Sequence, residues 1–306
     1  MRSLIVHNIG SGFGSNAIFE FQRELIGRGD ECVLRSLDKQ TPVADALLDA
    51  EEFDLVVISG GDGTVTNALY ALRERNVPAC VFPSGTANLL FANLGNAPEP
   101  ASIAKACLNC KPCPLDLGEM RWNNADGTET KHGFGIMAGM GFDAQIMATA
   151  SQNKGALGEA AYFAAALKNL KPTISTFTIE VDGEVYERTG ISCIIANTAM
   201  IQGDINILPN CTMNDGLLDV MVLLTTDAVQ LLLPIVAGLI DPVGTVLGRP
   251  RIERFSGRDI KVTSSIPLPI QLDGDAMDGT YNSYEAICLP KSNLIVVDEH
   301  SPYFVG

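Results

Sequence analysis

Basic residues are scarce in this chain of 306 residues. Its 21 Lys and Arg are outnumbered by 36 Asp and Glu, which gives a formal net charge of −15. Because nucleic-acid phosphates are bound by basic surfaces, this shortage excludes nucleic acid as the main partner. An anionic ligand must instead be met by backbone amides, by a metal ion or by a local basic patch.

Long apolar segments are also missing. The longest wholly apolar run, Leu231 to Ile240, contains Pro234 and Gly238 and is much shorter than the ~20 residues of a membrane-spanning helix. The apolar stretch after Met1 is too short for a signal peptide. We therefore expect a cytoplasmic protein whose membrane contact, if any, is peripheral and on the inner face. Its eight cysteines are then expected to be reduced thiols.

A complete cysteine metal motif is absent as well. Cys107, Cys110 and Cys113 form CxxCxxC, which resembles the start of an iron–sulfur run. Leu117 stands where the fourth ligand of that run belongs. The sequence therefore favours small apolar core residues over a metal site.

A glycine cluster ends an apolar run between Asp54 and Asn67, which reads DLVVISGGDGTVTN. The pattern predicts a strand, a tight loop and a helix with Thr64 as its N-cap. Glycines permit positive φ and let an anion approach the amides, which together with the helix dipole form a phosphate site. Asp62 fits beside a phosphate if a divalent cation lies between them, or if it handles a proton. An ordinary glycine turn is the alternative. The predicted nucleotide-binding residues here are Gly60, Gly61, Asp62, Gly63, Thr64 and Asn67, with the phosphates on the backbone of 60–64.

A second polar turn, PSGTAN at 83–88, follows the next predicted strand. Strands at 3–7, 31–37, 55–59 and 79–82 alternate with helices at 16–27, 44–51 and 64–73, which predicts a doubly wound parallel α/β sheet. Ligands of such sheets bind at the carboxyl ends of the strands, so both turns should lie at one cleft. Thr86 could donate to a phosphate or cap a helix, and Asn88 could fix the loop or the nucleotide. Ser84 and Gly85 complete this second set.

The composition changes near Leu115–Gly118, where we place a domain boundary. Residues 1–117 form the predicted nucleotide-binding domain, and 286–306 are expected to pack back on it. Residues 118–285 form a predicted antiparallel β-sandwich, with an Asp182-Gly183 hairpin and a helical insert near 155–170. Its predicted strands are 133–140, 174–181, 191–197, 216–224, 260–263 and 269–273.

Neither the P-loop pattern GxxxxGK[ST] nor the HRD and DFG set of protein kinases occurs. The GGDGT loop instead resembles the nucleotide-binding signature of the diacylglycerol kinase catalytic family, the lipid kinases that include sphingosine kinases. The segments PSGTAN, NDGLLD at 214–219 and DGD at 273–275 resemble further motifs of that family, in the same order. The resemblance covers nearly the whole chain and implies ATP and Mg²⁺ as cofactors.

The resemblance also assigns roles to single residues. Ser11 and Gly12 would face phosphate in the first loop, although Ile9 replaces the usual proline, and Ser36 resembles a nucleotide-contacting position only weakly. Leu89 replaces an aspartate that many members carry after Asn88. By the same resemblance, Mg²⁺ would be held by the carboxylate of Asp215 and the carbonyls of Thr212 and Leu217; locally, Asp215-Gly216 is also simple turn chemistry.

The family motif at the last acidic turn is DGE, and its acidic third residue acts as general base. In this chain Asp275 takes that place and is one methylene shorter, with Asp273 as the other catalytic carboxylate of the turn. Asp62 is a rival for the base.

An apolar stretch, 228–247, precedes a cluster of basic residues. The pair is either a buried helix followed by a solvated strand edge or a membrane-facing lid. The cations are Arg249, Arg251, Arg254, Arg258 and Lys261.

The resulting hypothesis is an enzyme, an ATP-dependent lipid kinase acting on diacylglycerol or a sphingoid-like acceptor at a membrane surface. NAD kinases and phosphofructokinases also resemble the GGDG loop, so a kinase for a soluble substrate is the first alternative. A catalytically silent nucleotide sensor is the second. A homodimer remains open.

Overall fold

The computed structural model describes residues 1–11, 16–38, 40–109, 111–124, 126–152, 170–201 and 205–304. The chain divides into two compact units: unit 1 comprises Met1–Leu117 and Pro290–Gly306, and unit 2 comprises Gly118–Leu289. The predicted class, an α/β domain followed by an antiparallel β-sandwich, is confirmed. Gly12, Cys110 and nearly all of the helix expected at 155–170 lie outside the described residues.

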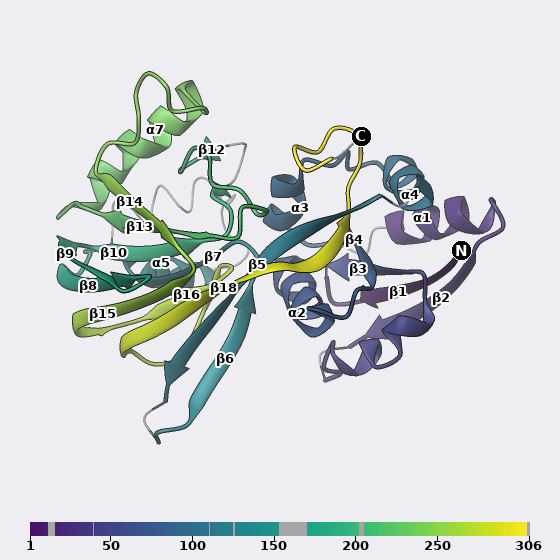
Figure 1. The fold of residues 1–306 in the computed structure, drawn as a ribbon, viewed down its shortest axis with the longest axis horizontal. Helices are drawn as coiled ribbons and strands as arrows, with labels where there is room; N and C mark the ends of the chain where they lie inside the picture. The colour runs from purple at the N-terminus through teal and green to yellow at the C-terminus, as the bar shows by residue number, and fades with distance from the viewer. Residues whose placement is uncertain are drawn as a thin grey trace. The chain divides into compact units, whose positions relative to one another are not determined.

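Unit 1 contains a parallel sheet in the strand order β2-β1-β3-β4-β18 (Figure 1). The central strand β3 is buried along its whole length, because both faces of a parallel sheet are covered. Helices α1 and α4 pack against each other. The strands are β1 (Arg2–Asn8), β2 (Glu31–Leu37), β3 (Leu55–Gly60), β4 (Pro78–Pro83) and β18 (Tyr281–Val296), and the helices are α1 (Ala17–Ile26), α2 (Asp62–Leu72), α3 (Leu89–Leu94) and α4 (Pro100–Asn109).

The helix predicted at 44–51 is wrong. Two short 3₁₀ turns occupy this stretch, η1 (Asp45–Leu47) and η2 (Ala50–Glu52). Arg35 gives a physical reason, because its guanidinium donates to the carbonyl of Ala46 (2.8 Å) and to the carboxylate of Asp49 (Nη2–Oδ2 2.7 Å). The Ala46 carbonyl is thereby bonded to a side chain from β2.

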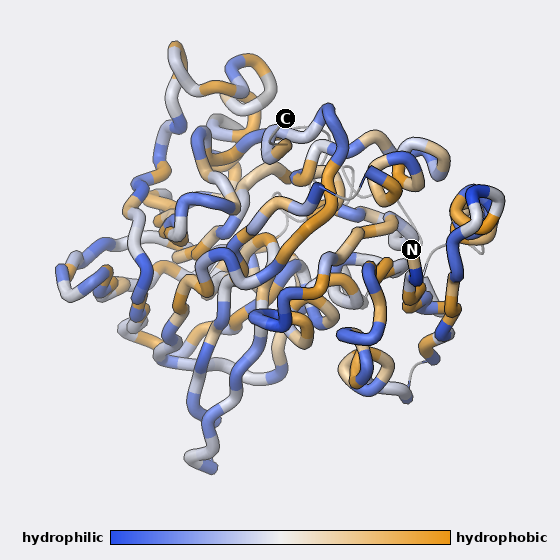
Figure 2. The backbone as a smooth tube through the Cα atoms, turned by 45° about the vertical axis from the view of Figure 1, so that its right-hand side comes forward, coloured by the Kyte–Doolittle hydropathy of each residue, from blue (hydrophilic) through white to orange (hydrophobic). Residues whose placement is uncertain are grey.

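Unit 2 is a β-sandwich. One antiparallel sheet has the order β14-β13-β10-β7-β16-β17. In the other, the order is β18-β15-β8-β9, and β5 pairs with β18 and with β6. The outer end of the β5–β6 hairpin is hydrophilic, as the blue tip at the bottom of Figure 2 shows. The strands are β5 (Pro112–Asn123), β6 (Glu129–Phe134), β7 (Met137–Gly141), β8 (Ser175–Val181), β9 (Glu184–Gly190), β10 (Ser192–Ala196), β13 (Leu218–Leu223), β14 (Ile252–Gly257), β15 (Asp259–Leu268), β16 (Ile270–Leu272) and β17 (Asp275–Ala276), with a separate pair β11 (Met200–Ile201) and β12 (Ile205–Asn206).

The sheet around β10 is covered on both faces. Cys193 and Ile195 belong to the core between the two sheets, whereas Ile194 and Ala196 face a second cluster. That second cluster includes residues of α5 (Phe142–Gln152) and of η3 (Ala228–Leu231), which precedes α7 (Leu232–Ile240). Since side chains alternate along a strand, two covered faces explain why β10 is apolar at nearly every position.

Two turns of unit 2 differ in how well the sequence predicted them. The Asp182-Gly183 hairpin is confirmed: both residues have positive φ (50° and 88°), as a two-residue turn between β8 and β9 requires. The single strand expected at 133–140 is wrong, because the chain breaks between β6 and β7 and these strands belong to different sheets. No helix among the described residues is long and apolar enough to cross a membrane.

Candidate active site

The loops that follow β1, β3 and β4 are tied to one another at the carboxyl ends of the strands. The Asn8 side chain donates from Nδ2 to Thr64 Oγ1 (2.8 Å). The hydroxyls of Ser59 and Ser84 share a hydrogen bond of 2.7 Å, and the Ser84 amide donates to the Gly60 carbonyl (3.1 Å). The two glycine turns that the sequence placed at one edge of the sheet are therefore brought together.

Glycine is required here for space. A Cβ added at Gly85 would lie 2.4 Å from the Gly61 Cα, and one added at Gly60 would lie 2.6 Å from the Thr64 Cβ. Gly61 has φ −84°, and Gly60 is not in the left-handed region either. The expectation that these two glycines adopt positive φ is thus wrong. They are needed because the backbones of the GGDGT and PSGTAN loops are in contact, which leaves no room for a Cβ.

Helix α2 begins at Asp62, with Gly61 in the N-cap position. Thr64 is therefore the third residue of the helix, and the predicted N-cap role is wrong; its hydroxyl accepts the bond from Asn8 instead. The first N–H groups of an α-helix have no partner within the helix. Those of α2 therefore lie where the sequence predicted phosphate contacts.

Asp62 has a partner within the fold. Its Oδ1 accepts a hydrogen bond from the Leu90 amide (2.9 Å), in the first turn of α3. This contact links the GGDGT loop to the helix that follows PSGTAN. It also satisfies one of the open N–H groups at the start of α3.

Asn88 fixes the PSGTAN turn. It occupies the N-cap position of α3 in the left-handed region (φ 48°), which asparagine tolerates better than most residues. Its Oδ1 accepts from the Gly85 amide (2.7 Å), and its Nδ2 donates to the Gly85 carbonyl (2.9 Å). Asn88 is thus the loop-fixing residue, Thr86 is exposed and is not the N-cap, and the nucleotide contacts of both stay predictions.

His7 extends the hydroxyl pair of this cluster. Its Nδ1 lies 2.9 Å from Ser59 Oγ, and partial burial lowers the pKa of the imidazole, which favours the neutral ring. The remaining predicted residues are less engaged: Ser36 is exposed on β2, Asn67 is exposed on α2, and the Ser11 amide donates to the Asn8 carbonyl (3.1 Å).

The DGD turn of unit 2 joins β16 to β17. The carboxylate of Asp273 accepts three backbone N–H bonds, from Gly135 (2.8 Å), Ile136 (2.8 Å) and Met137 (2.9 Å). Both of its oxygens are used, so Asp273 fixes the break between β6 and β7 that the sequence did not predict. Asp273 and Gly274 both have positive φ (46° and 92°).

Asp275 contrasts with its neighbour. It is the first residue of β17 and pairs with Leu272 in the hairpin register. Its side chain is exposed and has no hydrogen-bond partner among the described residues. A carboxylate held on a strand without a partner is sterically open to an incoming hydroxyl.

A partly buried carboxylate to which the sequence did not point is linked to this turn by hydrogen bonds. Asp143, in the first turn of α5, accepts hydrogen bonds from the Ser192 hydroxyl and from Gln271 Nε2 (3.1 Å). The amide oxygen of Gln271 in turn accepts from the Gly274 amide (2.9 Å), so hydrogen bonds connect Asp143 to the central residue of DGD. Burial raises the pKa of Asp143. A Cβ at Gly139 would lie 1.9 Å from Asp143 Oδ2, so a glycine makes room for the carboxylate.

The predicted metal turn is short, and its Asn214 and Asp215 are exposed. The Leu217 amide donates to Asp215 Oδ1 (3.0 Å), and the Thr212 hydroxyl donates to Asn214 Oδ1 (2.9 Å). The described residues contain no group of three or more His, Cys, Asp or Glu side chains placed to hold a metal. That finding does not test the predicted set, which has one carboxylate and two backbone carbonyls, so the Mg²⁺ site stays a prediction.

The basic cluster after the apolar stretch is largely paired within unit 2. Arg254 binds the buried Asp219 through two bonds (2.9 and 2.8 Å), and Lys261 pairs with Glu285 (3.0 Å). Arg249 donates to backbone carbonyls, among them that of Asn206 (2.7 Å). Of the five cations, Arg251 and Arg258 have exposed side chains without a hydrogen-bond partner among the described residues. The choice between a solvated strand edge and a membrane-facing lid stays a prediction.

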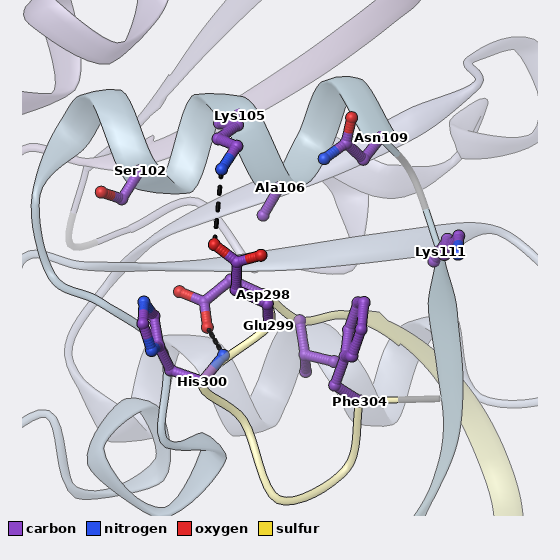
Figure 3. A pocket seen from close by; sticks show the side chains of 10 residues that line it. Ser102, Lys105, Ala106, Asn109, Lys111, Asp298, Glu299, His300 and Phe304 are labelled. Carbon is purple, nitrogen blue, oxygen red and sulfur yellow. Dashed lines mark hydrogen bonds and ion pairs between the residues drawn. The ribbon is translucent and has the colours of Figure 1, made fainter. Parts of the chain in front are cut away.

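A small hollow in unit 1, of about 80 Å³, lies between α4 and residues 297–304 (Figure 3). Its charges are largely paired: Lys105 with Glu299 (3.4 Å), and Asp298 with the His300 amide (2.8 Å). It is smaller than the ~300–1,000 Å³ of typical ligand pockets. No predicted nucleotide-binding residue lines it.

Comparisons with known proteins agree with this architecture. A model of the diacylglycerol kinase catalytic domain matches residues 2–120, and one of the YegS C-terminal NAD kinase beta sandwich-like domain matches residues 136–295. A solved diacylglycerol kinase structure from Bacillus anthracis has a TM-score of 0.70 at 18% identity, covering 98% of each chain. Yeast NADH kinase complexed with NADH has a TM-score of 0.56 at 12% identity, covering 98% of this chain and 84% of that one. At these identities the two structures establish the fold alone, which is that of the diacylglycerol and NAD kinases.

Sequence relatives show to which of the protein families with this fold the chain belongs. A "Probable lipid kinase YegS-like" of Pseudomonas putida is 32% identical over 254 residues, which is 81% of this chain and 79% of the relative. The diacylglycerol kinase of Bacillus subtilis is 27% identical over 231 residues, or 73% and 72% of the two chains. The match spans only 60% of "Uncharacterized protein sll0036" of Synechocystis, at 28% identity. The chain belongs to the diacylglycerol kinase catalytic family, with a C-terminal domain of the YegS type.

Proposed function

We propose that this protein transfers the γ-phosphate of ATP to a lipid hydroxyl, with diacylglycerol or a sphingoid-like lipid as acceptor. The observation that carries the proposal is the backbone contact of Gly61 with Gly85, which aligns two glycine turns at the carboxyl ends of β3 and β4. Membership of the diacylglycerol kinase catalytic family and the YegS-like relative support the lipid acceptor.

Unit 1 binds the nucleotide through backbone in this proposal. The N–H groups at the start of α2 and the helix dipole attract the phosphates of ATP, which compensates for the net charge of −15. The side chains of Asn8, Ser59 and Asn88 hold the loops and are themselves bonded to other loop atoms. The exposed hydroxyl of Thr86 has no hydrogen-bond partner among the described residues, so it can donate to a phosphate.

Unit 2 provides the base. Asp275 accepts the proton of the lipid hydroxyl. The oxygen of that hydroxyl forms a bond to the γ-phosphorus of ATP, and the bond between the γ-phosphorus and the leaving oxygen of ADP breaks. The exposure of Asp275 favours it over Asp62, whose carboxylate is engaged by the Leu90 amide, and over Asp273, whose oxygens are both used. Asp273 then positions the turn that carries the base.

Mg²⁺ fits the donors of the turn at 212–217. The carboxylate of Asp215 and the carbonyls of Thr212 and Leu217 form an all-oxygen set, which hard cations prefer. Asp219 is unsuited to join it because Arg254 already neutralises that carboxylate. When bound, the cation supplies positive charge to an acidic site.

The test is transfer of labelled γ-phosphate from ATP, with Mg²⁺, to a panel of acceptors. Diacylglycerol, monoacylglycerol and sphingosine are offered in mixed micelles, and NAD is offered in solution. A labelled lipid with no labelled NAD is expected. Labelled NAD alone would place the chain with the NAD kinases, whose fold it shares. ATP binding without any product would indicate a nucleotide sensor.

A further inference from the structure

An unusual concentration of exposed aliphatic side chains marks residues 236–247, which form the second half of α7 and the loop after it. Val246 is 84% exposed, Ile240 71% and Val243 64%, and Val236 and Leu247 are about half exposed. Figure 1 shows α7 and this loop standing out from the β13–β14 side of their sheet, and Figure 2 shows orange along α7. Clustered apolar exposure of this kind marks contact with a partner or a membrane.

The loop is held in a defined shape by one carboxylate. Asp241 accepts backbone N–H bonds from Gly244 (2.9 Å), Thr245 (3.2 Å), Val246 (2.8 Å) and Leu247 (2.8 Å). These bonds lower the pKa of Asp241 and keep it ionised. The exposed aliphatic side chains are thus presented by an ordered loop.

Arg249 completes the internal pairing of this loop. Its guanidinium donates to the carbonyls of Asp241 (3.0 Å), Pro242 (3.2 Å) and Gly248 (2.8 Å), and it ties the loop to Asn206 (2.7 Å). Because these backbone groups already have partners within the chain, moving them out of water costs less than moving unpaired ones.

The size and charge of the segment point to a lipid surface. A stable protein interface needs ~20–30 residues a side, many more than these five side chains provide. Residues 228–251 contain two Arg and one Asp, a net charge of 2 − 1 = +1 in a chain of −15. An apolar tip next to an exposed cation, here Arg251, is the pattern of elements that lie in a membrane interface.

We propose that residues 236–247 insert their aliphatic side chains into the interfacial layer of a lipid bilayer and so hold the protein at its surface. This proposal deepens the proposed function by naming the element that contacts the membrane. It rests on the proposed function only in taking lipid as the partner.

The test uses vesicles of phosphatidylcholine with a minor fraction of phosphatidylglycerol, without acceptor lipid or ATP. Val246→Asp is compared with Val185→Asp, a matched control because Val185 is 63% exposed on β9 and lies outside the segment. Val246→Asp should lower the vesicle partition coefficient about tenfold or more, and Val185→Asp should leave it unchanged. Equal binding of the two variants, or no binding by the wild type, overturns the proposal.

Fluorescence provides a second readout that does not depend on loss of function. Val246→Trp should shift its emission to the blue when vesicles are added, whereas Val185→Trp should not. If Val246→Asp instead converts a dimer to a monomer in sedimentation and vesicle binding is unchanged, the segment is a protein interface and the proposal is wrong. Phosphate transfer to a short-chain acceptor dispersed below its micelle concentration should be equal in Val246→Asp and wild type. Failure of the kinase proposal would therefore leave the vesicle result intact.

Discussion

The loops of unit 1 and the acidic turn of unit 2 use side chains and backbone amides in opposite ways. In unit 1 the polar side chains of Asn8, Ser59 and Asn88 hold the loops, and the proposed function assigns the nucleotide phosphates to backbone N–H groups. In unit 2 backbone amides are consumed in holding Asp273, and a side chain, that of Asp275, is left open. If the proposed function is right, a neighbouring residue positions the reactive group in both regions, so adjacent residues of one motif should respond differently to mutation.

The largest expected effect is on turnover. Asp275→Asn removes the proposed base and should lower kcat about 10²- to 10⁴-fold, with an unchanged melting temperature because the side chain has no described partner. Asp275→Glu, which restores the reach of the family's motif, is the control and should retain activity. Full turnover of Asp275→Asn in the lipid assay would assign the base elsewhere, with Asp62 next.

Gly85→Val should weaken nucleotide binding. The added side chain overlaps the Gly61 Cα, which its Cβ would approach to 2.4 Å, and must push the two loops apart. If ATP binding requires the two loops to return to their wild-type contact, an overpacking cost of about 2 kcal/mol raises the dissociation constant for ATP roughly thirtyfold. Ala87→Val, at an exposed position of the same turn, is the control. Calorimetric titration with ATP measures both; equal affinities would show that the close contact of the loops is irrelevant to binding.

Asp273→Asn should act on stability. An amide has one acceptor oxygen, and its NH₂ group would face N–H donors that the carboxylate now satisfies. The free energy of unfolding should fall by about 2–4 kcal/mol, measured by urea denaturation. Asp278→Asn, at an exposed neighbour, should cost less than about 0.5 kcal/mol. If Asp273→Asn unfolds like the wild type but is inactive, Asp273 takes part in chemistry.

The smallest effect concerns the pH dependence of stability. Because burial raises the pKa of Asp143, the folded state binds a proton more tightly than the unfolded state, and stability is lost as pH rises between the unfolded and folded pKa values. The side chain of Asp143→Asn does not titrate. Its amide NH₂ group can donate to the Ser192 hydroxyl, which in turn donates to the Met140 carbonyl (3.1 Å). The melting temperature of the wild type should therefore drop relative to the variant as the pH is raised from acid to neutral. Parallel curves would contradict this.

Local patterns in the sequence predicted the parts of the site that are local in structure. The strand–loop–helix at Leu55–Leu72 and its position at the carboxyl edge follow from an apolar run, a glycine cluster and the rule for parallel sheets. The role of the glycines did not, because the contact between Gly61 and Gly85 joins separate loops and has no signature in either.

Asp143 and Asp273 show the same limit in unit 2. Asp143 is the only charged residue between His132 and Lys154, which is the signal that could have drawn attention to it. Its partners Ser192 and Gln271 are distant in sequence, so no spacing connects the three. The sequence predicted the turn that contains Asp273 but not the hydrogen bonds of its carboxylate to the amides of 135–137. These residues are more than 130 positions away in the sequence, so no local pattern indicates the contact that fixes the break between β6 and β7.

The most direct test of the account measures ATP affinity and lipid phosphorylation on the same preparations of Gly85→Val and Asp275→Asn. Gly85→Val should bind ATP roughly thirtyfold more weakly, corresponding to about 2 kcal/mol. Asp275→Asn should bind ATP like the wild type and lose at least about a hundredfold in turnover. Loss of ATP binding by Asp275→Asn equal to that of Gly85→Val, or a lipid product formed by it at the wild-type rate, would contradict the division between a backbone nucleotide site and a side-chain base.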